Sequence, residues 1–173
     1  RGRIIGRQAE LEEAKILWRR AKQGQGQALL ISGEPGIGKT RLMREIITNA
    51  EVSGGTSLVG ECYAESNSPY SAFAQVTRQA LDLVRKENLD LPDTVLDDIL
   101  SLTPDLRFRF PDLEPNPKLD PESEQQRLFE NMVLLCSRLA GYSQLLMVVD
   151  DAHWADSGTV TMLHHLIRRT HNL

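Results

Sequence analysis

The chain has 173 residues, of which 40% are hydrophobic, and a formal net charge of −4. This composition suits one globular unit and argues against intrinsic disorder. The basic residues are spread thinly, so we expect no cationic surface for nucleic acid, and DNA contact only through a domain absent from this chain. No apolar run approaches the ~18 residues needed to span a bilayer. The two cysteines, Cys62 and Cys136, suit free thiols in a reducing compartment. We therefore expect a cytoplasmic protein that does not enter membranes.

The first third of the chain predicts helix, strand, loop and helix in that order. Apolar residues recur at helical spacing over residues 8–22, which predicts an amphipathic leading helix. The apolar run at 28–33 predicts a strand that enters a glycine-rich turn, and with the helix after it the unit covers residues 28–51. Residues 56–64 predict a second strand.

The remainder alternates predicted helices with one more strand. Residues 104–121 hold five of the eight prolines, which predicts an irregular connection and the most mobile surface of the protein. Asp120 and Pro121 are typical of an N-cap and a first helical turn. The apolar run of residues 144–150 predicts a strand, within a strand-and-turn unit at 145–156. Predicted helices cover 70–85, 94–102, 120–140 and 158–169. Strands alternating with helices predict an α/β fold with a parallel sheet covered on both faces.

The sequence GEPGIGKT, from Gly33 to Thr40, fits the G-x-x-x-x-G-K-[ST] pattern of a phosphate-binding loop. Glycines allow backbone angles that side chains forbid, so that successive N–H groups can point at one phosphate. The following helix adds the partial positive charge of its N-terminus. The ammonium of Lys39 can reach the β- and γ-phosphates, and the hydroxyl of Thr40 can ligate Mg²⁺.

The strand LLMVVD ends on Asp150 and is followed at once by Asp151. Two adjacent carboxylates repel each other, and burying one without a cation or a donor is costly. Beside a phosphate-binding loop, Asp150 is suited to hold Mg²⁺ through water, and Asp151 is suited to orient or deprotonate the attacking water. A second aspartate could equally cap the following turn.

Several segments together resemble a known family. IIGRQAELE, GEPGIGKTRL, PYSAF, DPESEQQRLFE and VVDDAHWADSGT are similar to the AAA+-type ATPase domain of the STAND class. Such domains occur in large LuxR-family transcriptional regulators and beside class III nucleotidyl cyclases and protein kinases. The resemblance implies a P-loop NTPase fold, with three α/β/α layers around a parallel sheet, that binds ATP or ADP with Mg²⁺. DDAHWAD is its most distinctive part.

The resemblance also assigns roles to individual residues. It makes Asp150 and Asp151 the Walker B acids, with Lys39 and Asp151 catalytic and with Thr40 and Asp150 holding the metal. It implies that Trp154 and Asp156 fix the turn after the strand. The nucleotide-binding residues that it implies are Ile5, Gly6 and Arg7 near the adenine, where a plain helix-entry turn is the alternative, and Gly33, Glu34, Pro35, Gly36, Ile37, Gly38, Lys39, Thr40 and Arg41 around the phosphates.

The sequence departs from the wider AAA+ pattern in two respects. Asp151 is one methylene shorter than the usual glutamate, so we expect slow hydrolysis. The chain begins at Arg1 and stops at Leu173, so we expect a piece of a longer protein, truncated before the sensor strand and the helical lid. In that family the missing strand lies between the strand that precedes the phosphate-binding loop, here 28–33, and the Walker B strand. This leaves three alternatives: these two strands pair directly, another chain or segment fills the gap, or the sheet is distorted.

Three functions are compatible with these motifs. The first is an ATP-dependent signalling switch that contacts further domains of the same polypeptide, with possible homo-oligomers. The second is an AAA+ motor or loader resembling replication initiators, which GRQAELE also resembles. The third is an interaction module that has lost its nucleotide. DDAHWAD favours the first, and intact Lys39, Thr40 and Asp150 argue against the third.

Overall fold

The computed structural model describes residues 7–65 and 68–170. Two parallel strands, β1 (Thr56–Glu61) and β2 (Leu145–Asp150), pair so that Thr56 lies opposite Leu145 and Glu61 opposite Asp150. The helices are α1 (Gln8–Ala21), α2 (Lys39–Val52), α3 (Ser71–Lys86), α4 (Asp93–Leu100), α5 (Pro121–Tyr142) and α6 (Ser157–Thr170), with short 3₁₀ helices η1 (Pro104–Arg109) and η2 (Ala152–Trp154). The fold is α/β with a small parallel sheet, as the sequence predicts.

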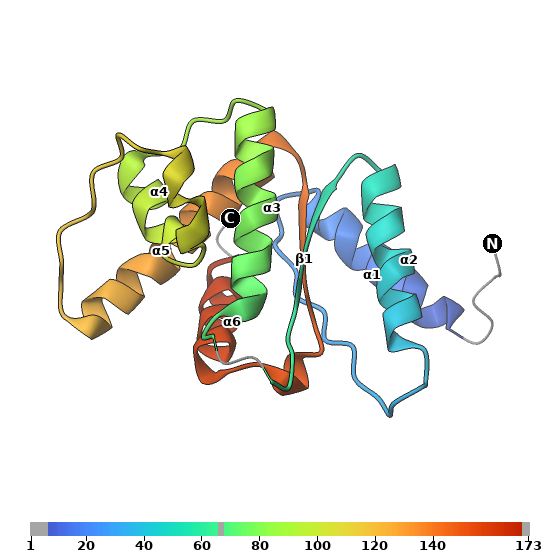
Figure 1. Cartoon of the computed structure of the whole chain (residues 1–173). Helices are drawn as coiled ribbons and strands as arrows, with labels where there is room; N and C mark the ends of the chain where they lie inside the picture. The colour runs from blue at the N-terminus through green and yellow to red at the C-terminus, as the bar shows by residue number, and fades with distance from the viewer. Residues whose placement is uncertain (1–6, 66–67, 171–173) are drawn as a thin grey trace.

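The strands lie between two groups of helices. Figure 1 shows α1 and α2 on one side of the strand pair and α3, α4, α5 and α6 on the other. The hydrophobic core lies on the second side, where Phe73 of α3, Ile99 of α4 and Met132 of α5 are fully buried. The larger helical group therefore supplies most of the buried apolar surface that stabilises the fold.

The strand predicted over residues 28–33 is not formed, and this prediction was wrong. The segment carries no strand assignment, and 46% of Leu29 and 85% of Leu30 is exposed. An apolar run becomes a strand only when a neighbour pairs with its backbone, and the described sheet consists of β1 and β2. Direct pairing of the segment at 28–33 with β2 is therefore excluded for the described residues. Every residue of β2 is half-buried.

The outer edge of β1 is closed by two glutamine side chains of α3. The Val59 N–H donates to Oε1 of Gln79 at 3.0 Å, and Nε2 of Gln79 donates back to the Val59 carbonyl at 2.7 Å. Gln75 makes the same pair of bonds with the backbone of Glu61, at 3.2 and 2.8 Å. These amides satisfy the groups that a neighbouring strand would otherwise bind, so this edge is blocked against further pairing.

The proline-rich connection at 104–121 is tied to the helices. Arg78 of α3 forms a two-bond ion pair with Asp105 at 2.5 and 2.6 Å, and Arg109 contacts Asp82 of α3 at 3.1 Å. The connection contains η1 and leads to Asp120, whose carboxylate accepts the Ser123 N–H at 3.1 Å and caps α5. The N-cap predicted at Asp120 is confirmed. The mobility expected of the connection stays a prediction, and the ion pairs fasten the connection to α3.

Candidate functional site

The loop that fits the phosphate-binding pattern opens directly into α2. Gly36 and Gly38 adopt φ values of 80° and 92°, a left-handed region that side chains rarely enter. Gly38 is the N-cap of α2 and provides no side chain to bond the first helical N–H groups. These N–H groups therefore remain available to an anion at the positive end of the helix.

Lys39 lies across the loop that precedes it. Its Nζ donates to the carbonyl of Gly33 at 2.8 Å and to that of Glu34 at 3.0 Å. An ammonium group has three donors, so these two bonds leave it able to contact an anion held by the loop. The other predicted phosphate-contacting residues are exposed, namely Gly33, Glu34, Pro35, Gly36, Ile37, Gly38, Thr40 and Arg41.

The carboxyl end of β2 fixes Asp150 and turns the chain at Asp151. The Asp150 carbonyl accepts the Cys62 N–H at 3.1 Å, which continues the strand pairing by one bond. Its side-chain Oδ1 accepts the Asp151 N–H at 2.8 Å. Asp151 adopts φ 51° and is exposed. The two carboxylates therefore have different surroundings, with one held at the strand end and the other on the turn in solvent.

Glu61 adds a third carboxylate that the sequence analysis missed. It lies opposite Asp150 in the strand pair, and directly paired residues present their side chains to the same face of a sheet. Ser57, four residues earlier in β1 and on the same face, donates to Glu51 of α2, so Glu61 and Asp150 face the side of α2. Only the strand register could have revealed this neighbour.

The pKa of the Cys62 thiol reflects the negative charge at the carboxyl end of the sheet. Burial raises its pKa, and the nearby carboxylates of Asp156, Asp151, Asp150 and Glu61 raise it further. The carboxyl end of the sheet is therefore an electronegative region, which favours a cation. Among the described residues no cluster of three or more His, Cys, Asp and Glu could hold a metal alone. A Mg²⁺ ion here would depend on phosphate oxygens and water for its remaining ligands.

The residues expected near the adenine are described only in part. Arg7 immediately precedes α1, and its carbonyl accepts the Leu11 N–H at 3.2 Å. Ile5 and Gly6 lie outside the described residues. On the turn after β2, Trp154 is 52% exposed, and its ring lies 4.9 Å from that of His153.

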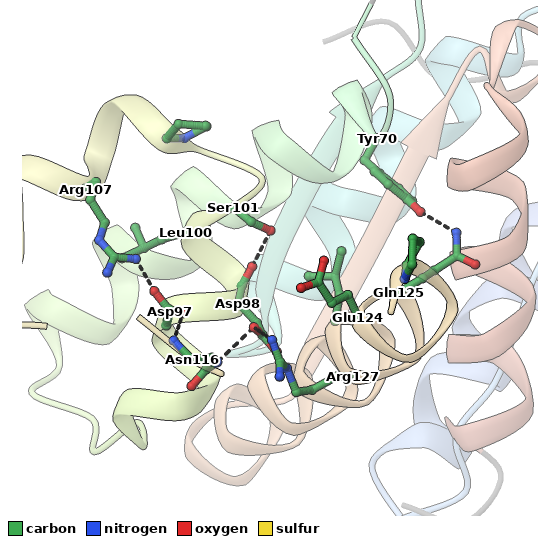
Figure 2. Close-up of a pocket in the computed structure, with 13 residues that line it drawn as sticks. Tyr70, Asp97, Asp98, Leu100, Ser101, Arg107, Asn116, Glu124, Gln125 and Arg127 are labelled. Carbon is green, nitrogen blue, oxygen red and sulfur yellow. Dashed lines mark hydrogen bonds and ion pairs between the residues drawn. The ribbon is translucent and has the colours of Figure 1, made fainter. Parts of the chain in front are cut away.

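A pocket of about 650 Å³ lies elsewhere, between α4, η1 and the start of α5 (Figure 2). Tyr70, Gln125 and Leu128 line it together with charged side chains of α4 and α5. None of the residues from Gly33 to Arg41 lines it. The hollow is therefore separate from the loop that fits the phosphate-binding pattern.

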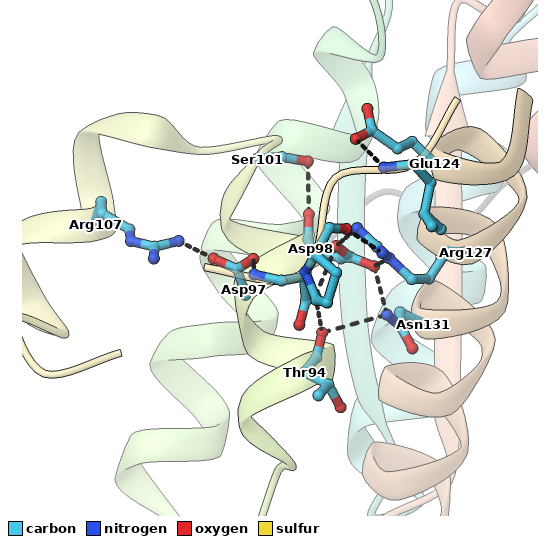
Figure 3. Close-up of polar contacts among 11 residues, drawn as sticks. Thr94, Asp97, Asp98, Ser101, Arg107, Glu124, Arg127 and Asn131 are labelled. Atoms are coloured by element: carbon cyan, nitrogen blue, oxygen red, sulfur yellow. Dashed lines mark hydrogen bonds and ion pairs between the residues drawn. The ribbon is translucent and has the colours of Figure 1, made fainter. Parts of the chain in front are cut away.

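The wall of this pocket is a network centred on buried Asp98 (Figure 3). Its carboxylate accepts bonds from Arg127 at 2.7 Å, from Asn131 at 2.7 Å and from Asn116 at 2.8 Å. Neighbouring Asp97 is partly buried, which opposes ionisation, but the Asn116 N–H and the Arg107 guanidinium lower its pKa overall. The charged side chains of this wall are paired with one another within the protein. Because the network joins residues of the proline-rich connection to residues of α4 and α5, it fastens the connection to these helices.

These elements define a class of protein. An α/β domain in which a glycine-rich loop opens a helix, and a parallel strand ends on acidic residues, has the arrangement of a P-loop nucleotide-binding domain. The family model described as "AAA ATPase domain" matches residues 3–173. The chain belongs to this family, and membership indicates nucleotide binding, usually with Mg²⁺.

One curated relative extends this finding. The "Uncharacterized protein R02095" of Rhizobium meliloti (strain 1021) is 25% identical over 182 residues, which cover 96% of this chain and 17% of that protein. The chain thus spans less than a fifth of the length of this relative. No solved structure matches the chain. Within residues 7–65 and 68–170, each helix is too short or too polar to span a lipid bilayer.

Proposed function

We propose that this chain is the ATP-binding, slowly hydrolysing switch domain of a multidomain signal-transduction or transcription-regulatory protein. In this proposal ATP and ADP stabilise different arrangements of the domain against further domains of the same polypeptide, and hydrolysis resets the switch. The site of action is the cytoplasm, and any DNA contact belongs to another domain. Homo-oligomers are compatible with this proposal.

The observation that best supports nucleotide binding is the position of Lys39, which is the first residue of α2 and follows an N-cap without a side chain. Lys39 bonds to two carbonyls of the loop, and Gly38 leaves the first N–H groups of α2 without a side-chain cap. A phosphate in the loop would gain both the ammonium charge and these donors. The exposed loop leaves room for the approach of a nucleotide.

The proposed chemistry divides the polar residues into two roles. Thr40 and Asp150 would hold Mg²⁺, which supplies charge neutralisation for the phosphates when it is bound. Exposed Asp151 would orient or deprotonate the attacking water. The shorter reach of aspartate compared with glutamate supports slow turnover. Arg7, with Ile5 and Gly6, is proposed to lie near the adenine.

A switch is favoured over a motor by the turn after β2. DDAHWAD resembles the STAND class, whereas GRQAELE also resembles replication initiators. The alternative of an AAA+ motor or loader would be preferred if turnover were fast and independent of further domains of the protein.

Titration calorimetry with ATP and ADP, each with and without Mg²⁺, tests the proposal. We expect binding that strengthens with Mg²⁺, and at least a tenfold loss of affinity in Lys39→Ala, because the phosphates lose their charged donor (about 1.4 kcal/mol or more). Lys86→Ala is the matched control, since Lys86 is a largely exposed lysine on α3 that pairs with Glu87. Unchanged affinity in Lys39→Ala would reject the loop as the phosphate site.

A further inference from the structure

Tyr70 has an unusual backbone conformation at the start of α3. It is the N-cap residue and adopts φ 60° and ψ 26°, a left-handed conformation that is uncommon for a bulky side chain. Such conformations persist when the surrounding structure holds them, and they concentrate at functional sites. We therefore expect the contacts around Tyr70 to hold it in this conformation.

Three elements meet at Tyr70. Its N–H donates to Oδ2 of Asp156 at 3.1 Å, on the turn between β2 and α6. Its hydroxyl accepts a bond from Nε2 of Gln125 at 2.9 Å, as Figure 2 shows, and its ring meets Phe129 of α5 edge-on at 6.2 Å. A Cβ atom on Gly158 of α6 would lie 2.8 Å from the ring. Tyr70 is thus fastened to α5 and closely packed against α6.

Asp156 is the acceptor of the hydrogen bond from the Tyr70 N–H. Its Oδ1 accepts the Thr159 N–H at 2.9 Å, and its Oδ2 accepts the Thr159 hydroxyl at 2.6 Å. Partial burial opposes its ionisation, but the bonds from Thr159 and Tyr70 lower its pKa overall. Both oxygens of the carboxylate are therefore engaged, one with α6 alone and the other also with the start of α3.

The turn between Asp151 and Asp156 is short. η2 occupies Ala152–Trp154, between Asp151 and the extended residue Ala155 that precedes Asp156. The turn is anchored at its first end by the pairing of Asp150 with β1, and at its second end by the contact of Asp156 with Tyr70. The Asp151 carbonyl accepts the Trp154 N–H at 2.9 Å, so a shift of the second anchor would act on the turn that begins at Asp151.

We propose that Tyr70 and Asp156 form a positioning pair that holds the turn carrying Asp151 in the geometry needed for ATP hydrolysis. This inference rests on the proposed function, because it concerns the turn on which Asp151 lies. The pair acts through the turn and not on the nucleotide itself. Its loss should therefore reduce turnover and leave the binding of Mg·ATP intact.

Asp156→Asn tests the pair with little risk to folding. Asparagine caps helices as well as aspartate does. It has one acceptor oxygen where the carboxylate has two, so it cannot accept the main-chain N–H groups of Thr159 and Tyr70 on separate oxygens. In the full-length protein we expect kcat to fall about tenfold or more, with the affinity for Mg·ATP within about twofold of wild type. Hydrogen exchange of the amides at 152–156 should accelerate about tenfold.

Asp120→Asn is the matched control, because Asp120 caps α5 by the same contact with a main-chain N–H. It should leave both turnover and exchange at 152–156 unchanged. Tyr70→Phe retains the main-chain donor and the ring but removes the bond with Gln125, and should lower kcat less than Asp156→Asn does.

The outcomes separate this inference from the function on which it rests. If Asp156→Asn hydrolyses ATP at the wild-type rate although exchange at 152–156 accelerates, the pair is only a structural cap. That result would overturn the inference and leave the proposed function standing. Unchanged exchange would overturn the pair itself. Absence of Mg·ATP binding by the wild-type protein would instead reject the proposed function, and the role of the pair in hydrolysis with it.

Discussion

Asp150 and Asp151 are adjacent carboxylates that the backbone treats differently. Asp150 completes a strand, and its carboxylate accepts the N–H of the next residue at 2.8 Å. Asp151 turns away through a left-handed conformation and lies exposed. The local donor and the access to water reduce the cost of placing two negative charges side by side. Glu61, opposite Asp150, adds to the negative field that would attract a cation.

Asp151→Asn should leave ATP bound while turnover in the full-length protein falls about 10²-fold or more, because the amide cannot accept a proton from water. Steady-state ATPase rates beside calorimetric affinities would measure both effects. Asp82→Asn on α3 is the control, since Asp82 is a largely exposed acid paired with Arg109. Normal turnover in Asp151→Asn would assign the water to another group, and Glu61→Gln would then be the next variant.

At the scale of elements, two helices carry glycines in contrasting surroundings. Gly141 lies near the end of α5, where an added Cβ would meet nothing within 4 Å. Gly158 lies in the first turn of α6, where the added atom would be 2.8 Å from the ring of Tyr70 and 3.0 Å from Oδ1 of Asp156. Helix propensity favours alanine at both positions, so contacts outside the helix decide the difference.

Gly141→Ala should raise the free energy of unfolding by about 0.5 kcal/mol. Gly158→Ala should lower it by about 1–2 kcal/mol, because Tyr70 is held by α5 and cannot move aside freely. Denaturant unfolding of both variants measures the contrast. A stabilised Gly158→Ala would show that the ring of Tyr70 is loosely held.

At the scale of the whole molecule, the sheet is asymmetric. Gln75 and Gln79 block the outer edge of β1, whereas β2 is half-buried throughout. Leu30, in the segment at 28–33, is largely exposed, while Leu58 of β1 is 2% exposed. Of the described sheet, the outer edge of β1 is therefore closed to an additional strand.

This asymmetry predicts losses of very different size when two leucines of the 173-residue chain are replaced by alanine. Leu58→Ala should cost about 2–4 kcal/mol of unfolding free energy because it leaves a cavity in the core. Leu30→Ala should cost less than about 0.5 kcal/mol, because the side chain is already in water. Urea unfolding of the two variants gives the comparison. A loss above about 2 kcal/mol in Leu30→Ala would place the segment at 28–33 within the packed sheet.

The features that the sequence determined by itself depend on neighbouring residues. The helices follow from apolar periodicity, α5 begins where Asp120 and Pro121 provide a cap and a fixed φ, and the glycines before Lys39 permit the left-handed turns of the loop. In each case the interacting groups lie within a few residues of one another, so local spacing is sufficient.

The tertiary structure decided what depends on residues far apart in the chain. Tyr70 and Asp156 are 86 residues apart, and Asp98 bonds to Arg127 across 29. Glu61 faces Asp150 only because the strands pair in that register. The segment at 28–33 has a strand-like sequence, yet the described structure offers it no paired neighbour. Strand pairing and buried polar contacts require a partner, and which partner comes within reach is determined by the packing of the whole chain.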